Sequence, residues 1–222
     1  MNFIKVIRDE SSLHDILNTD DFKVSYVNLN NYLDLIETPN YQDFNFTVDS
    51  SRIASFLACD ALMPDFSGYM CQLIETSKKL LFIGGSKEEA SLFEIAIKKR
   101  FPEKFIKVYD GYNSFDYYRE VHGEFSPDTV VCSMGFPLQE NLILYLSEYS
   151  SAPCKYLACG AFISQTARNA VGYPPLIIRL NLRWLYRLIN EKNARKRAIK
   201  ILYNYLRLYG KKGSCFRHSI RF

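Results

Sequence analysis

The chain has 222 residues, enough to bury the core of one large domain, or of one domain with an appendage. Its 6 cysteines and 3 histidines are scattered without a C-x-x-C pair or a metal-ligand spacing, so a zinc site is not expected and the cysteines are predicted to be reduced cytosolic thiols. No signal-peptide core opens the chain, and no run approaches the roughly 18 apolar residues of a membrane span. These features predict a cytoplasmic protein that is soluble or peripheral, and they indicate neither a metal ion nor a cofactor.

The formal net charge of +4 conceals an asymmetry between the two ends of the chain. Residues 179–222 contain 13 lysines and arginines against one acid, a net charge of +12, whereas residues 1–178 have a net charge of −8. A basic tail on an acidic body favours a polyanionic partner: a nucleic acid, an anionic membrane surface or a polyanionic substrate. The alternative is a solvated tail that binds nothing.

Strands and helices are predicted to alternate along most of the chain. Residues 1–21 predict a short strand or helix followed by a loop. Further strands are predicted over residues 22–29, 44–48, 79–85, 105–109, 129–134 and, as the last one, 156–162. Helices are predicted over residues 32–36, 51–59, 66–78, 87–100, 114–121 and 137–149. This spacing favours βαβ units and therefore an α/β fold, with a mainly parallel, Rossmann-like sheet flanked by helices.

After Pro174 and Pro175 the pattern is helical and contains no strand, which predicts a domain over residues 1–173 and a basic helical appendage over residues 174–222. In the appendage, apolar residues at helical spacing alternate with tyrosines and basic residues over 195–209. This pattern suits an amphipathic helix in a membrane interface. The alternative is that the apolar face docks onto the sheet, and different halves of the segment could do each.

One stretch of the domain combines a buried strand, a turn and a helix start. A β-branched run over residues 129–131 leads to Gly135, and a helix begins around Pro137, which fits the first turn because the missing N–H costs little there. In α/β sheets, ligands bind beyond the carboxyl ends of the strands, where helix N-termini offer N–H groups to phosphate. Gln139 and Glu140 lie at this place, although a glutamate there also complements the helix dipole.

Residues 133–140, Ser-Met-Gly-Phe-Pro-Leu-Gln-Glu, resemble the G-x-G-x-P-x-Q-E signature of the WecG/TagA/CpsF family of bacterial glycosyltransferases. Residues 159–167 are similar to the glycine-aromatic strand end of that family, and residues 180–188 resemble its W-L-Y-R helix. The resemblance covers roughly residues 80 to 195, whereas the N-terminal third matches loosely. It implies an inverting transfer of a hexose or N-acetylhexosamine-type sugar from a UDP-sugar to a polyprenyl-diphosphate-linked saccharide, in the synthesis of O antigen, capsule or teichoic acid.

Such a transfer requires a carboxylate that removes a proton from the acceptor hydroxyl. Asp49 is the first candidate, because it follows a predicted strand and the family has a catalytic Asp-Gly pair at such a strand end, although Ser50 stands here in place of the glycine. Asp65 is the rival, since Pro64 to Gly68 resembles the family's P-D-G-x-G with Phe66 at its first glycine. The two alignments exclude each other, and an aspartate in a loop also serves as a cap or turn former.

The leaving diphosphate develops negative charge that must be neutralised. The chain lacks the D-x-D pair with which such enzymes hold a metal ion, which favours arginines and backbone N–H groups, as the resemblance also implies. Arg183 and Arg187, on one cationic helix ridge with Arg179, are candidates to bind diphosphate bidentately.

The remaining candidates for substrate binding lie at or beyond predicted strand ends, including the first turn of a helix, and several also have a packing or turn-forming role as their alternative. Three roles are considered for them: cradling phosphate in a turn, stacking of a tyrosine on uracil, and hydrogen bonding of amides to the sugar or the base. These residues are Asn28, Asn30, Gly84, Gly85, Gly111, Tyr112, Gly135, Gln139, Glu140, Gly160, Phe162 and Gln165.

The expected partners are therefore a UDP-sugar, a polyprenyl-diphosphate-linked acceptor and, through the appendage, the anionic inner face of the cell membrane. Nucleic acid is not expected, because the basic residues of the tail alternate with apolar ones and form no recognised nucleic-acid motif. Two other functions stay open: a family member that binds UDP without turnover, suggested by Ser50 and Phe66, and a nucleic-acid-binding module. The oligomeric state is open too, and a homo-oligomer is among the possibilities.

Overall fold

The computed structural model describes residues 4–37, 39–49, 51–60, 67–171, 194–208, 210 and 220–221. Its strands are β1 (Ile4–Val6), β2 (Phe22–Val27), β3 (Asn45–Val48), β4 (Lys79–Gly84), β5 (Phe105–Tyr109), β6 (Thr129–Ser133), β7 (Lys155–Ala158) and β8 (Ile220–Arg221). Its helices are α1 (Glu10–Leu17), α2 (Tyr32–Glu37), the 3-10 helix η1 (Pro39–Tyr41), α3 (Ser51–Leu57), α4 (Ser67–Thr76), α5 (Lys87–Arg100), α6 (Phe115–Phe125), α7 (Leu138–Glu148), α8 (Phe162–Val171) and α11 (Ala194–Leu208).

All strands join one 8-stranded sheet in the order β5-β4-β6-β7-β2-β3-β1-β8, and every neighbouring pair is parallel. The predicted α/β fold with a parallel, Rossmann-like sheet is thus confirmed. β5 and β6 follow β4 in the chain but pair with its opposite edges, so the order of the strands reverses at β4. Such a reversal opens a crevice at the carboxyl ends of the strands, where α/β proteins bind ligands.

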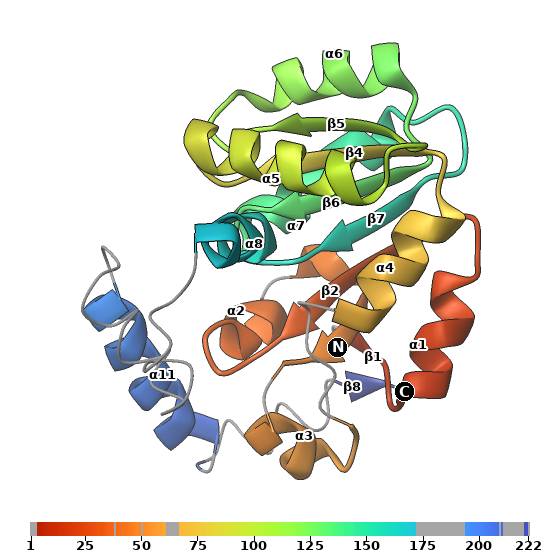
Figure 1. Ribbon diagram of the computed structural model, residues 1–222. Helices are drawn as coiled ribbons and strands as arrows, with labels where there is room; N and C mark the ends of the chain where they lie inside the picture. Colours follow the sequence, from red (N-terminus) through yellow and green to blue (C-terminus); the bar gives the residue numbers. More distant parts are fainter. Residues whose placement is uncertain are drawn as a thin grey trace.

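Helices cover both faces of the sheet and bury a separate hydrophobic cluster on each (Figure 1). Residues of α1, α4, α5 and α8 pack on one face, while α2, α3, α6, α7 and the last residue of α11 pack on the other. β6 is buried along its whole length because it lies inside the sheet with both faces covered, which explains its continuous β-branched run. None of the helices in these ranges is both long and apolar enough to cross a bilayer.

The structure corrects three sequence-based predictions. Residues 1–21, predicted to hold either a short strand or a helix before a loop, contain both β1 and α1, because Asp9 accepts a hydrogen bond from the backbone of Ser12 and the helix buries two leucines. The strand predicted to reach Phe162 ends at Ala158, and Phe162 instead begins α8. The C-terminal segment was predicted without strands, but β8 pairs with β1 and extends the sheet.

Candidate active site

The loops that follow β2, β3, β4, β5, β6 and β7 open at the same edge of the sheet, because all strands are parallel. The sequence predicted a site at this carboxyl edge, and the structure brings most of the predicted residues to it. They are Asn28, Asn30, Asp49, Gly84, Gly85, Gly111, Tyr112, Gly135 and Gly160. Asp65, Arg183 and Arg187 lie outside the described residues.

Glycines allow the loops after β4, β5 and β6 to pack closely together. A Cβ on Gly84 would lie 2.2 Å from the carbonyl oxygen of Ser133, so no side chain fits there. Gly111 donates its N–H to the carbonyl of Gly85 at 3.0 Å, and a Cβ on Gly111 would meet the Cα of Gly84 at 3.2 Å. These glycines form a compact floor at the edge of the sheet.

The N-terminus of α5 follows this glycine turn and carries the predicted capping box. Ser86 accepts from the backbone N–H of Glu89, and Glu89 Oε2 accepts from the backbone N–H of Ser86 at 3.0 Å. Ser164 of α8 donates to the same oxygen at 2.6 Å, which joins the first turns of the two helices. Together with Glu88, this turn holds two carboxylates, and their negative charge opposes the binding of phosphate at this helix end.

Among the described aromatic residues, Tyr112 at this edge is the most exposed, with 83% of its surface accessible. The loop of Tyr112 is nevertheless held in place by Asp110. The side chain of Asp110 accepts a hydrogen bond from the backbone N–H of Tyr112 at 3.0 Å, and the backbone carbonyl of Asp110 accepts one from the hydroxyl of Tyr118. An exposed ring on an ordered turn is available to stack on a planar ligand such as a nucleobase.

Gln139 and Glu140 are fully buried, although they belong to the first turn of a helix at the ligand-binding edge. The side-chain oxygen of Gln139 accepts the N–H of Gly160 at 3.0 Å and that of Gly135 at 3.3 Å. Ser133 reinforces the connection, because its hydroxyl donates to the carbonyl of Gly160 at 2.8 Å. The turns after β6 and β7 are thus tied together by side chains rather than by strand pairing.

Asp49 follows β3 directly and is half-buried beside the end of β2. Its N–H donates to the carbonyl of Val27 at 2.9 Å, which places Asp49 next to Asn28 at the carboxyl edge. The pKa of Tyr26 is raised by burial first, and the nearby carboxyls of Glu140 and Asp49 raise it further when they are ionised. Asp49 and Glu140 thus both lie near the hydroxyl of Tyr26.

The loop after β2 is stabilised by its own asparagines. Asn28 accepts from the backbone N–H of Asn30 at 2.8 Å, while Asn31 accepts from the N–H of Asn28 and donates to the carbonyl of Tyr26. The turn-forming alternative for Asn28 is therefore realised. The side-chain oxygen of Asn30 is buried and has no hydrogen-bond partner among the described residues.

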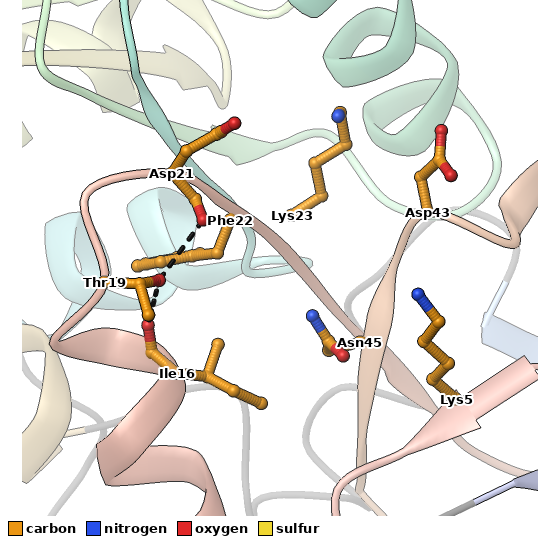
Figure 2. A pocket seen from close by; sticks show the side chains of 8 residues that line it. All are labelled: Lys5, Ile16, Thr19, Asp21, Phe22, Lys23, Asp43 and Asn45. Carbon is orange, nitrogen blue, oxygen red and sulfur yellow. Dashed lines mark hydrogen bonds between the residues drawn. The ribbon is translucent and has the colours of Figure 1, made fainter.

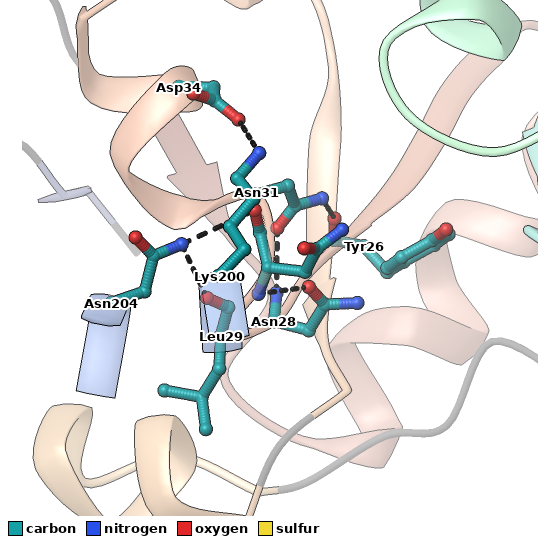
Figure 3. A network of polar contacts seen from close by, with 8 residues as sticks. Tyr26, Asn28, Leu29, Asn31, Asp34, Lys200 and Asn204 are labelled. Atoms are coloured by element: carbon teal, nitrogen blue, oxygen red, sulfur yellow. Dashed lines mark hydrogen bonds and ion pairs between the residues drawn. The ribbon is translucent and has the colours of Figure 1, made fainter. Parts of the chain in front are cut away.

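The C-terminal helix α11 packs against this loop (Figure 3). Asn204 donates to the carbonyl of Leu29 at 2.8 Å, and the hydroxyl of Tyr32 donates to the carbonyl of Asn204 at 2.7 Å. Lys200 forms an ion pair with Asp34 of α2 at 2.8 Å. A segment 175 residues further along the chain thus borders the candidate site.

Two predicted residues of α8 have different environments. Phe162 packs edge-on against Phe93 of α5, with ring centroids 5.6 Å apart, and belongs to a hydrophobic cluster. Gln165 is half-buried one turn further along α8. The packing alternative is thus supported for Phe162.

Ser25, Tyr26 and Asn204 are polar residues at the site that the sequence reasoning did not single out. Ser25 lies in an alternating strand, a pattern that predicts exposure, yet it is 1% exposed because β2 lies inside the sheet with both faces covered. Asn204 carried no such signal, because Arg197 and Lys200 occupy the same helix face in the sequence, so an asparagine there does not stand out.

A hollow of about 420 Å³ lies away from this site, at the opposite, amino edge of β1, β2 and β3 (Figure 2). Its wall includes Lys5, Lys23, Asp21 and Asp43, and the hydroxyl of Thr19 there bonds to backbone carbonyls. Two lysines and two aspartates thus give this wall no excess of either charge. Among the described residues, no three His, Cys, Asp or Glu side chains are grouped as metal ligands.

A parallel sheet with glycine turns, amides and a carboxylate at its carboxyl edge places this chain in the class of doubly wound α/β proteins, which bind their ligands at that edge. The model of the glycosyl transferase WecG/TagA/CpsF family matches residues 58–215, and the chain belongs to this family. This confirms the resemblance found in the motifs.

The chain is also similar to a curated relative, the UDP-Gal:alpha-D-GlcNAc-diphosphoundecaprenol beta-1,4-galactosyltransferase of Shigella boydii. The two are 41% identical over 70 residues, which is 32% of this chain. The match spans 29% of the relative, less than one third of its length.

Proposed function

We propose that this protein is an inverting glycosyltransferase that moves a sugar from a UDP-sugar to a polyprenyl-diphosphate-linked saccharide. The observation that carries the proposal is the position of Asp49, at the carboxyl edge beside Asn28, in a chain of a glycosyltransferase family. The name of the Shigella relative indicates which substrates to test first: UDP-galactose and a diphospholipid-linked N-acetylglucosamine.

In this proposal Asp49 is the general base. Its carboxylate takes the proton from the acceptor hydroxyl, and the acceptor oxygen attacks the anomeric carbon from the face opposite to UDP. The bond between the sugar and UDP breaks, UDP leaves with the bonding electrons, and the configuration inverts. Tyr112 would stack on uracil, while Arg183 and Arg187 would neutralise the diphosphate, because the two carboxylates at the start of α5 disfavour that position.

Residues 174–222 would form the basic appendage that reaches the membrane surface. The exposure of α11 supports this assignment: Ile199, Leu202, Tyr203 and Leu206 are 54–69% exposed, whereas Asn204 and Leu208 face the protein body. The stripe residues Ile199, Leu202 and Leu206 are thus exposed, while Leu208 at the end of the helix packs against the body. An exposed apolar stripe beside lysines and arginines matches the surface of an anionic bilayer.

The test of the function is transfer of labelled sugar from UDP-galactose, and then from other UDP-sugars, to a diphospholipid-linked saccharide. Asp49→Asn should lower kcat by about 10²- to 10⁴-fold, because the variant lacks the base, while UDP still binds. Asp43→Asn is the matched control, since Asp43 lies just before the other end of the same strand. If Asp65→Asn loses activity and Asp49→Asn keeps it, Asp65 is the base.

The second candidate function is a family member that binds UDP without turnover. Ser50 and Phe66, which replace two glycines of the family pattern, favour it. UDP binding together with absence of transfer from the whole panel of UDP-sugars would establish this alternative. Absence of both would contradict both candidate functions.

A further inference from the structure

Gln139 and Glu140 do not face the open edge of the site but form a buried clamp beneath it. The side-chain oxygen of Gln139 accepts hydrogen bonds from the N–H groups of Gly160 and Gly135, which belong to two different turns. A rotation of the amide by 180° would turn an NH₂ group toward these donors and break both bonds. The orientation of this one amide therefore determines how the two turns are joined.

Glu140 selects that orientation. Its Oε1 accepts from Gln139 Nε2 at 2.9 Å, and also from the hydroxyl of Ser25 in β2 at 2.5 Å. When the proton of the neutral acid is on Oε2, Oε1 is a carbonyl oxygen that only accepts, so the NH₂ group of Gln139 faces Glu140 and its oxygen faces the glycines. Ser25 donates to the same oxygen of Glu140, so the clamp extends from β2 to α7 and to both glycine turns.

The surroundings of the carboxyl favour its neutral form. Its Oε2 is buried and has no hydrogen-bond partner among the described residues, a costly state for a carboxylate oxygen. Among the described residues, Tyr26 of β2, Tyr41 of η1 and Cys132 of β6 sense its charge, Asp49 lies on the far side of Tyr26, and none of these is a cation. Burial accordingly raises the pKa of Glu140.

We propose that Glu140 is a positioning residue, which as a neutral acid fixes Gln139 and thereby the spacing of the turns at Gly135 and Gly160. That these turns border the sugar donor rests on the proposed function, whereas the clamp itself does not. Gln139 and Glu140 are then not substrate ligands, although the sequence motif had suggested that they are. Their role is to hold the floor on which the donor would lie.

Glu140→Gln tests the proposal because it keeps the accepting oxygen and removes the titration. In the wild type, the folded state retains a proton that the unfolded state has released once the pH exceeds about 4.5, the ordinary value of the group. Stability is therefore lost as the pH rises from that value toward the raised pKa of the folded state. The variant has no such loss.

The measurement is thermal unfolding of wild type and Glu140→Gln between pH 5 and pH 8.5. The Tm of the variant relative to wild type should increase with pH, by about 3 °C for each unit by which the pKa is raised. Glu148→Gln, an exposed position on the same helix, is the matched control for the change in charge and should show a constant difference. A constant difference for Glu140→Gln, or a variant that becomes less stable as the pH rises, would overturn the proposal.

Transfer kinetics separate positioning from catalysis. Glu140→Gln should keep kcat within about threefold and the wild-type pH profile, whereas Glu140→Ala, which frees Gln139, should raise the donor KM about tenfold or more. A loss of 100-fold or more in kcat for Glu140→Gln would instead make Glu140 a catalytic residue. If the wild type transfers no sugar, the proposed function fails, and the unfolding data still decide the role of the clamp.

Discussion

Gly160→Ala probes the contact between the turn after β7 and the strand β2. Gly160 has φ +59°, and a Cβ there would lie 2.8 Å from the hydroxyl oxygen of Tyr26. The left-handed backbone costs about 1–2 kcal/mol for a residue with a side chain. The crowding adds about 1–3 kcal/mol, because Tyr26 is only 8% exposed and has little room to move.

We therefore expect Gly160→Ala to lower the free energy of unfolding by about 2–5 kcal/mol in urea titrations. Gly135→Ala is the matched control, since Gly135 has φ +82° and a Cβ there would meet nothing within 4 Å. It should lose only the backbone contribution, about 1–2 kcal/mol. The difference between the two variants measures the crowding against Tyr26.

Tyr26→Phe in the Gly160→Ala background completes a double-mutant cycle. Without the hydroxyl, the nearest ring atom to the new Cβ is Cζ at 3.3 Å, so most of the crowding is relieved. The coupling energy should be about 1–3 kcal/mol. Equal destabilisation by the two glycine variants, or additivity in the cycle, would show that the turn does not press against Tyr26.

Three further predictions follow from the described contacts. Asn204→Ala removes the hydrogen bond to the carbonyl of Leu29, so hydrogen exchange of the backbone amides in α11 should become about 5- to 30-fold faster. An unchanged exchange rate would mean that this bond does not hold the helix. Leu202→Glu combined with Leu206→Glu should reduce sedimentation with anionic vesicles at least about tenfold, and undiminished binding would exclude the exposed stripe as the contact. Burial lowers the pKa of His122, so below about pH 6.5 the unfolded state gains a proton that the folded state does not, and the folded state loses stability. The Tm of the wild type should therefore fall more than that of His122→Gln between pH 7.5 and 5.5. Parallel Tm curves for the two proteins would contradict this.

Local signals in the sequence determined much of the architecture. Alternation, β-branched runs and glycine turns identified β2 to β6 and their order in the chain, and the capping box at Ser86 and Glu89 identified the start of α5. The spacing of α11 indicated an apolar stripe before its exposure was known. These features depend on residues within one turn or one strand, so the sequence of that segment alone is enough to predict them.

The roles of the site residues required the tertiary structure. The motif placed Gln139 and Glu140 at the mouth of a ligand site, but the fold turns both inward. Ser25 contacts Glu140 across 115 residues of chain, a proximity that no local pattern encodes. Likewise, strand β8 exists because β1 offers it an edge.

Burial explains this division between sequence and structure. The period of a helix or strand is set by its own backbone, and the sequence of the segment therefore reveals it. Whether a polar side chain faces solvent, a ligand or another polar group depends on what covers it from distant parts of the chain. For Glu140 that covering comes from β2, and only the assembled sheet shows that its carboxyl is enclosed.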